Sequence, residues 1–134
     1  MPFPLLTLAL LLAQSSPSAC AGPDPAIGSA TIANVTDNGD LKHYAIDVAV
    51  TNDGRQRQPG NVLQSVEIFR NGQKVDTKGI PPLPPGIAYH FTYGLDRSAD
   101  AGEGTTQLTF RLIVSSPPNA VDCNPGNDIL QLAV

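Results

Sequence analysis

Residues 41–54 read LKHYAIDVAVTNDG, and this segment carries the clearest structural pattern of the chain. The positions between its apolar side chains are mostly polar, as at His43, Asp47 and Thr51. The apolar positions recur at every second residue, and they are Tyr44, Ile46, Val48 and Val50. Period-two alternation with one apolar face predicts a half-buried β-strand, which the Asn-Asp-Gly turn signal ends.

Similar short apolar segments lie on both sides of this strand and are separated by turn residues. Asn71-Gly72 favours a type I′ hairpin, because both central residues of that turn need a positive φ. Residues 80–86 read IPPLPPG, and their four prolines donate no amide hydrogen, so we expect a crossover between sheets there. The expected strands are 27–35, 41–51, 62–70, 73–78, 87–94, 107–114 and 127–134. They predict an all-β fold, a seven-stranded immunoglobulin-like antiparallel β-sandwich.

The first residues have the build of a secretory signal peptide. The apolar run from Leu5 to Ala13 is about nine residues, too short for a transmembrane helix, and small residues follow it. We expect a signal peptide over residues 1–21, cleaved somewhere between 15 and 21, and one domain over 22–134. The opposing interpretation is a buried N-terminal strand or helix. A signal peptide predicts a secreted protein, in the extracellular space or the periplasm.

The two cysteines are Cys20 and Cys123, and the cleavage point decides the fate of the first. An exported chain with two cysteines predicts one disulfide. Cleavage after Ala21 would remove Cys20 instead. A third alternative is lipid attachment at Cys20, which would make the protein a membrane-anchored lipoprotein.

Charge and hydropathy limit the classes of partner. The formal net charge of −4 argues against a nucleic-acid footprint, which needs clustered Lys and Arg. No stretch reaches the roughly twenty apolar residues of a transmembrane helix. We therefore expect a monomer with a protein or cell-surface ligand.

A catalytic alternative rests on three side chains. His43, Asp47 and His90 all fall on the solvent side of strands that are neighbours in such a sandwich, and a His–Asp pair can orient a general base. The chain has no Gly-x-Ser-x-Gly nucleophile motif. The main prediction is thus a non-catalytic module, and the alternative is a small exported hydrolase or accessory factor that uses these three residues.

No metal or cofactor is predicted. A blue-copper site needs a His after its Cys and a weak axial Met, yet no His follows Cys123 and Met1 is the only methionine. The acidic segment from Leu95 to Thr106, with Asp96, Asp100 and Glu103, is interpreted as a solvated loop.

Two further surface features depend on single residue types. The chain has no Trp, and its tyrosines Tyr44, Tyr89 and Tyr93 fall on the core side of their strands, which argues against a sugar-binding platform. Asn34-Val35-Thr36 is a glycosylation acceptor sequence, so Asn34 is a modification site if the source glycosylates.

Several short segments, in this order, are similar to a known family. They are residues 47–54 (DVAVTNDG), 66–72 (VEIFRNG), 83–86 (LPPG) and 119–122 (NAVD) followed by Asn127-Asp128. Together they resemble the CARDB domain, the cell-adhesion-related domain found in bacteria, over about residues 45–134. The last segment departs from the family pattern at Cys123 and at Asp128, where a second Asn is common. The resemblance implies a seven-stranded sandwich, a role in adhesion or spacing, and no catalytic residues.

Overall fold

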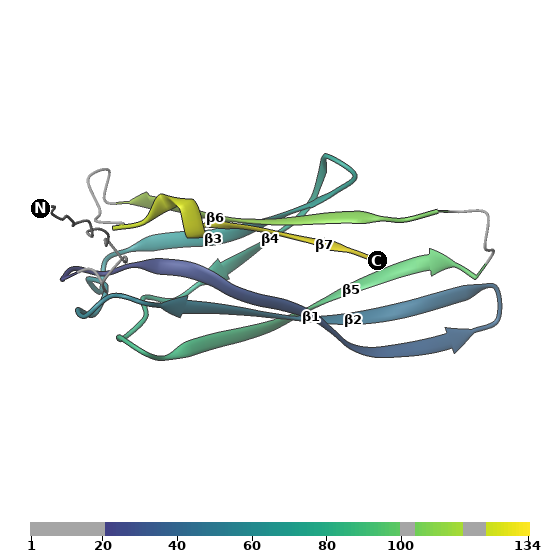
Figure 1. Cartoon of the computed structure of the whole chain (residues 1–134), viewed down its shortest axis with the longest axis horizontal. Helices are drawn as coiled ribbons and strands as arrows, with labels where there is room; N and C mark the ends of the chain where they lie inside the picture. Colours follow the sequence, from purple (N-terminus) through teal and green to yellow (C-terminus); the bar gives the residue numbers. More distant parts are fainter. Residues whose placement is uncertain (1–20, 100–103, 117–122) are drawn as a thin grey trace, which may run out of the picture.

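The computed structural model describes residues 21–99, 104–116 and 123–134, and it confirms the all-β fold (Figure 1). The expected signal peptide lies almost entirely outside the described residues. One short 3-10 turn, η3, covers Pro125–Asn127. The strands are β1 (Pro25–Asn38), β2 (Leu41–Asn52), β3 (Leu63–Arg70), β4 (Gln73–Ile80), β5 (Ala88–Ser98), β6 (Gln107–Ser116) and β7 (Ile129–Ala133).

The strands form two sheets that lie face to face, as the predicted sandwich requires (Figure 1). One sheet has the order β1-β2-β5 and the other β4-β3-β6-β7, and all neighbours are antiparallel. The proline-rich segment 81–87 joins β4 of one sheet to β5 of the other, so the predicted crossover is confirmed.

The β3–β4 hairpin turns through the residues that the sequence indicates. Asn71 has a φ of 51° and Gly72 a φ of 87°, the left-handed values that a type I′ turn needs. The Asn71 side chain also accepts a hydrogen bond from the Gln107 amide, at 2.9 Å, and this contact ties the hairpin to the start of β6.

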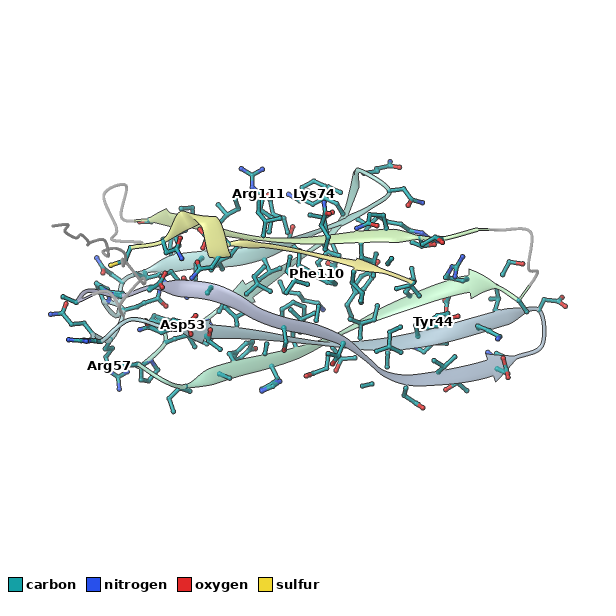
Figure 2. All side chains as sticks on the ribbon, in the orientation of Figure 1. Tyr44, Asp53, Arg57, Lys74, Phe110 and Arg111 are labelled. Atoms are coloured by element: carbon teal, nitrogen blue, oxygen red, sulfur yellow. The ribbon has the colours of Figure 1, made fainter. Side chains whose placement is uncertain are left out.

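The space between the sheets is filled by apolar side chains of both. Figure 2 shows Phe110 between the two sheets, whereas Lys74 and Arg111 lie on the outer side of the four-stranded sheet. Phe110 is fully buried and meets the Tyr93 ring edge to face, with the ring centroids 6.4 Å apart. The other core residues with no exposed surface are Ile46, Val48, Val50, Val66, Ile68 and Leu108.

A buried polar residue, Asn52, joins three segments at one end of the sandwich. Its Oδ1 accepts hydrogen bonds from the amides of Asp24 and Gly54, each at 3.0 Å. Its Nδ2 donates to the carbonyls of Gln56, at 2.7 Å, and Leu83, at 3.0 Å. Asn52 is fully buried, and these four contacts satisfy its amide group. The Asn of the segment VTNDG is therefore a structural residue that holds the N-terminal segment and the crossover together.

Two buried glutamines extend this polar cluster toward β3. Gln58 and Gln64 form a reciprocal pair of amide hydrogen bonds, both 2.8 Å long. The Leu83 amide donates to Gln58 Oε1 at 3.0 Å, and Gln64 donates to the Pro81 carbonyl at 3.0 Å. The glutamines thus bind backbone groups of the crossover that have no ladder partner, and they fix its path.

Gly54 is required at its position by the close approach of the N-terminal segment. A Cβ atom there would lie 2.0 Å from the Gly22 carbonyl oxygen and 2.7 Å from the Asp24 nitrogen. Gly86, at the end of the crossover, has a φ of 74°, a conformation that favours glycine. Gly54 and Gly86, like Gly72 in the hairpin, thus have a backbone reason to be glycine in the family-like segments.

The first and last strands lie next to each other but belong to different sheets. The Asn127 side chain donates to both carboxylate oxygens of Asp24 at 3.3 Å, which places the start of β7 beside the start of β1. Both strands run away from this point in the same direction (Figure 1). No hydrogen-bonded ladder joins β1 to β7 in the described residues.

Three expectations from the sequence are wrong in detail. β5 continues to Ser98, so Asp96 lies in a strand and not in a loop. Tyr89 keeps its predicted side of the sheet but is 37% exposed, because β5 is an edge strand and lacks a neighbour on one side. The last strand begins at Ile129 and not at residue 127, since η3 occupies the preceding positions.

Candidate functional site

The candidate site residues lie on the outer face of the three-stranded sheet. β2 and β5 pair without interruption from Leu41↔Ser98 to Thr51↔Ala88. His43 and Asp47 in β2 and His90 in β5 share this outer face, as the sequence predicts. The structure places them in two separate His–Asp pairs and not in one group.

The first pair joins His43 to Asp96, its direct cross-strand neighbour. His43 Nδ1 lies 2.7 Å from Asp96 Oδ1, and the two side chains are 47% and 62% exposed. The imidazole also lies over Gly94, where a Cβ atom would be 2.9 Å from His43 Cε1. Gly94 therefore leaves the space that the ring fills.

The second pair joins His90 to Asp47 on the diagonal of the same ladder, because His90 itself opposes Ala49. His90 Nδ1 lies 3.1 Å from Asp47 Oδ2. Both side chains are partly exposed, at 56% and 35%. In each pair the carboxylate holds one ring nitrogen and leaves Nε2 directed elsewhere.

This face is open to solvent, and that exposure limits the reactions that its two His–Asp pairs could catalyse. A His–carboxylate pair can orient a general base, but a covalent mechanism needs a nucleophile in hydrogen-bond reach. In the described ranges, neither imidazole has a hydroxyl or thiol hydrogen-bond partner. Sequence reasoning missed Asp96 as a partner because it placed this residue in a loop; the alternation of Tyr93 and Leu95 was the signal that β5 continues.

Other titratable groups gather between the open edges of β4 and β5. Burial raises the pKa of the Tyr93 phenol above its ordinary value, while the nearby Arg70 charge lowers it and Asp76 raises it further. Lys78 lies 3.9 Å from Asp76 on the same side of β4. The edge of β4 thus carries two charges on its inner side.

A metal site is not formed by the part of the chain that the structure describes. Its residues contain no group of three or more His, Cys, Asp and Glu side chains that could hold an ion. Cys123 is exposed and carries no free thiol, and Cys20 lies outside the described residues, so their pairing stays a prediction. Asn34 is exposed on β1, and its glycosylation likewise stays a prediction.

One groove lies on the other sheet, away from the His–Asp pairs. It has a volume of about 520 Å³ between β3 and the start of the proline crossover, and its lining includes Leu63, Ser65, Gly79 and Pro81. Among the described residues, no helix is long and apolar enough to cross a membrane.

Comparison with solved structures gives the fold a precedent. The CARDB domain of a Pyrococcus furiosus protein, solved in complex with di-metal ions, superposes with a TM-score of 0.60 at 19% identity, over 89% of this chain and 92% of that chain. A domain of a candidate cell surface protein from Methanosarcina acetivorans superposes with a TM-score of 0.58 at 20% identity, over 84% of this chain and 90% of that domain. No protein-family model matches the chain, and no curated protein does. The chain therefore has the fold seen in CARDB domain structures.

Proposed function

We propose that the chain is an exported, non-catalytic CARDB-type module that serves adhesion, binding or spacing at a cell surface. The observation that carries this proposal is the extent of the structural likeness. It spans 89% of this chain and 92% of a CARDB domain, so the likeness covers nearly the whole of that domain. The second similar structure belongs to a candidate cell surface protein, which supports the same location.

The residues that resemble the family support a structural role for its motifs. Asn52, Gly54, Leu83 and Gly86 hold the end of the sandwich together through backbone contacts and close packing. They leave the outer faces of both sheets and the loops free to vary with the ligand. A binding or spacing module needs this combination of a fixed frame and open faces.

The proposal is tested by cell fractionation together with intact mass. The full chain, expressed in a bacterial host that exports proteins, should appear outside the cytoplasm with its N-terminus within or just after residues 15–21. If Cys20 is retained and paired, the mass rises by two hydrogens on reduction; a lipid at Cys20 would add the mass of its acyl chains.

Binding of the labelled mature domain to intact cells of the source should saturate and be displaced by unlabelled domain. A full-length chain that stays in the cytoplasm would contradict export, and non-saturable binding would contradict adhesion.

A second candidate, hydrolysis at the sheet face, is favoured by one observation, the 3.1 Å contact between His90 and Asp47. Ester and peptide substrates should be tested with the wild type and with the variants His90→Ala and His43→Ala. We expect equal background rates in all three proteins. A positioned general base contributes about 10²–10⁴-fold. A rate that falls by that factor in His90→Ala alone would therefore establish the enzyme and overturn the non-catalytic proposal.

A further inference from the structure

The β5 edge of the three-stranded sheet differs from the other sheet edges in being long and regular. β1 has two register shifts, after Ile27 and after Ile32. β4 has a register shift opposite Ile68 and carries the inner charges of Asp76 and Lys78, and β7 has only five residues. Bulges, inner charges and short strands are the usual means of blocking an edge against further pairing. β5 spans eleven residues, contains no Pro, and pairs with β2 without a shift; its one inner charge, Arg97, lies next to the last residue of the strand.

The sequence of β5 is complementary to itself when two copies run antiparallel about Tyr93. The strand reads AYHFTYGLDRS from Ala88 to Ser98, and Tyr93 is its middle residue. In that register the six cross-strand combinations are Ala88 with Ser98, Tyr89 with Arg97, His90 with Asp96, Phe91 with Leu95, Thr92 with Gly94, and Tyr93 with itself. Opposite charges and two apolar side chains are favourable cross-strand pairs. Arg97 already donates to the Gly104 carbonyl of its own chain, so its contact with Tyr89 carries less of the argument.

We propose that β5 is a self-association edge, where a second copy of this chain adds its own β5 antiparallel and the two three-stranded sheets become one six-stranded sheet. A two-fold axis that passes between the two Tyr93 residues would relate the two copies. Two-fold symmetry is the most common closed symmetry among dimers. The proposed dimer differs from the monomer that we expect from the sequence. It does not depend on export or on the adhesion role.

The two His–Asp pairs gain a role in this dimer. Asp96 uses Oδ1 for His43, and His90 uses Nδ1 for Asp47. Asp96 keeps Oδ2 and His90 keeps Nε2, and these are the atoms that can meet across the new strand pair. The outer face then carries a continuous row from His43 through Asp96 and the partner's His90 to the partner's Asp47. The row fixes the register, since a shift by one residue would turn these side chains to the opposite face.

The same register covers the apolar surface that β5 leaves open. Tyr89 is 37% exposed, and Phe91 and Tyr93 are only partly buried. On the inner side of the strand, Tyr89 would meet the partner's Arg97 and Phe91 would meet the partner's Leu95. The exposed end of β5, which the core of one copy does not cover, thus becomes part of an interface.

Charge exchange at the two paired positions tests the register directly. One variant carries His90→Lys with Asp96→Lys, and a second carries His90→Asp, so that each alone places like charges opposite each other. Sedimentation equilibrium, at about 50 mM salt to limit screening, should show a wild-type dimer and a dissociation constant at least about tenfold weaker for each variant. The equimolar mixture of the two variants should recover dimers, because every pair across it is then Lys with Asp.

A matched control is Glu67→Lys, which makes the same charge reversal as Asp96→Lys on the outer face of the other sheet. It should dimerise like the wild type, and circular dichroism and thermal melting should show that all variants fold. A loss of folding stability in either variant cannot explain dimers that form again when the two variants are mixed. A wild type that stays monomeric up to about 1 mM, variants that dimerise unchanged, or a mixture that stays monomeric would each overturn the proposal.

Discussion

Asn52→Ala lowers the free energy of unfolding by about 3–5 kcal/mol, because the fully buried Asn52 amide makes four hydrogen bonds to the backbone that an alanine cannot replace. The amides of Asp24 and Gly54 lose an acceptor and the Gln56 carbonyl loses a donor, whereas the Leu83 carbonyl keeps the hydrogen bond from the Gln58 amide. Each unsatisfied buried group costs roughly 1–3 kcal/mol, and water that enters the space left by the side chain offsets part of the sum. The free energy is measured by urea or guanidinium denaturation.

Two companion variants separate the hydrogen bonds of Asn52 from its bulk. Asn52→Asp keeps the volume and the acceptor for both amides but loses the two donated bonds and buries a charge, so it also destabilises strongly. Asn34→Ala makes the same substitution at an exposed position of β1 and should change stability by no more than about 0.5 kcal/mol. A loss below about 1 kcal/mol in Asn52→Ala would mean that the end of the sandwich is held by other contacts.

The second large effect is expected for Phe110→Ala, which should cost about 3–5 kcal/mol. Phe110 is fully buried in β6, the strand between β3 and β7, and its ring meets Tyr93 of the opposite sheet. Truncation removes apolar burial and leaves a cavity between the sheets that Tyr93 cannot fill from its edge-to-face position. The same denaturation experiment measures the loss.

Ile129→Ala is the control for this variant, since Ile129 lies on the neighbouring β7 and is 55% exposed. It should cost well under half as much as Phe110→Ala. Phe110→Leu should fall between the two, because it keeps part of the buried volume. Equal losses in Phe110→Ala and Ile129→Ala would contradict a core centred on β6.

The strands in which apolar and polar residues alternate strictly could be predicted from the sequence. A strand with one buried face needs an apolar side chain at every second residue. Val48, Val66 and Phe110 all lie on the side that the alternation assigns to the core. The same parity placed Tyr89 on the inner side but could not show its exposure, since that depends on which strand lies at the edge. The order of strands in a sheet is a tertiary property that local pattern does not carry.

The candidate site was predicted only in part for a similar reason. The shared face of His43, Asp47 and His90 follows from parity and from β2 and β5 being neighbours. Which carboxylate meets which imidazole depends on the register between these strands, and the pairing of His43 with Asp96 is a direct cross-strand contact that only the register reveals. The reciprocal pair of Gln58 and Gln64 had no sequence signal, because one partner lies in an irregular loop.

The placement of β1 and β7 in separate sheets has a mechanical consequence. The two strands start together at Asp24 and Asn127 and run in the same direction, and no ladder joins them in the part of the chain that the structure describes. Tension that pulls β1 at its start and β7 at its end therefore slides one sheet along the other. The first resistance comes from the interlocked side chains between the sheets and from the Asn127–Asp24 contact, and the hydrogen-bonded ladders carry load only later. We therefore expect the resistance of this fold to such tension to depend on how well the core is packed.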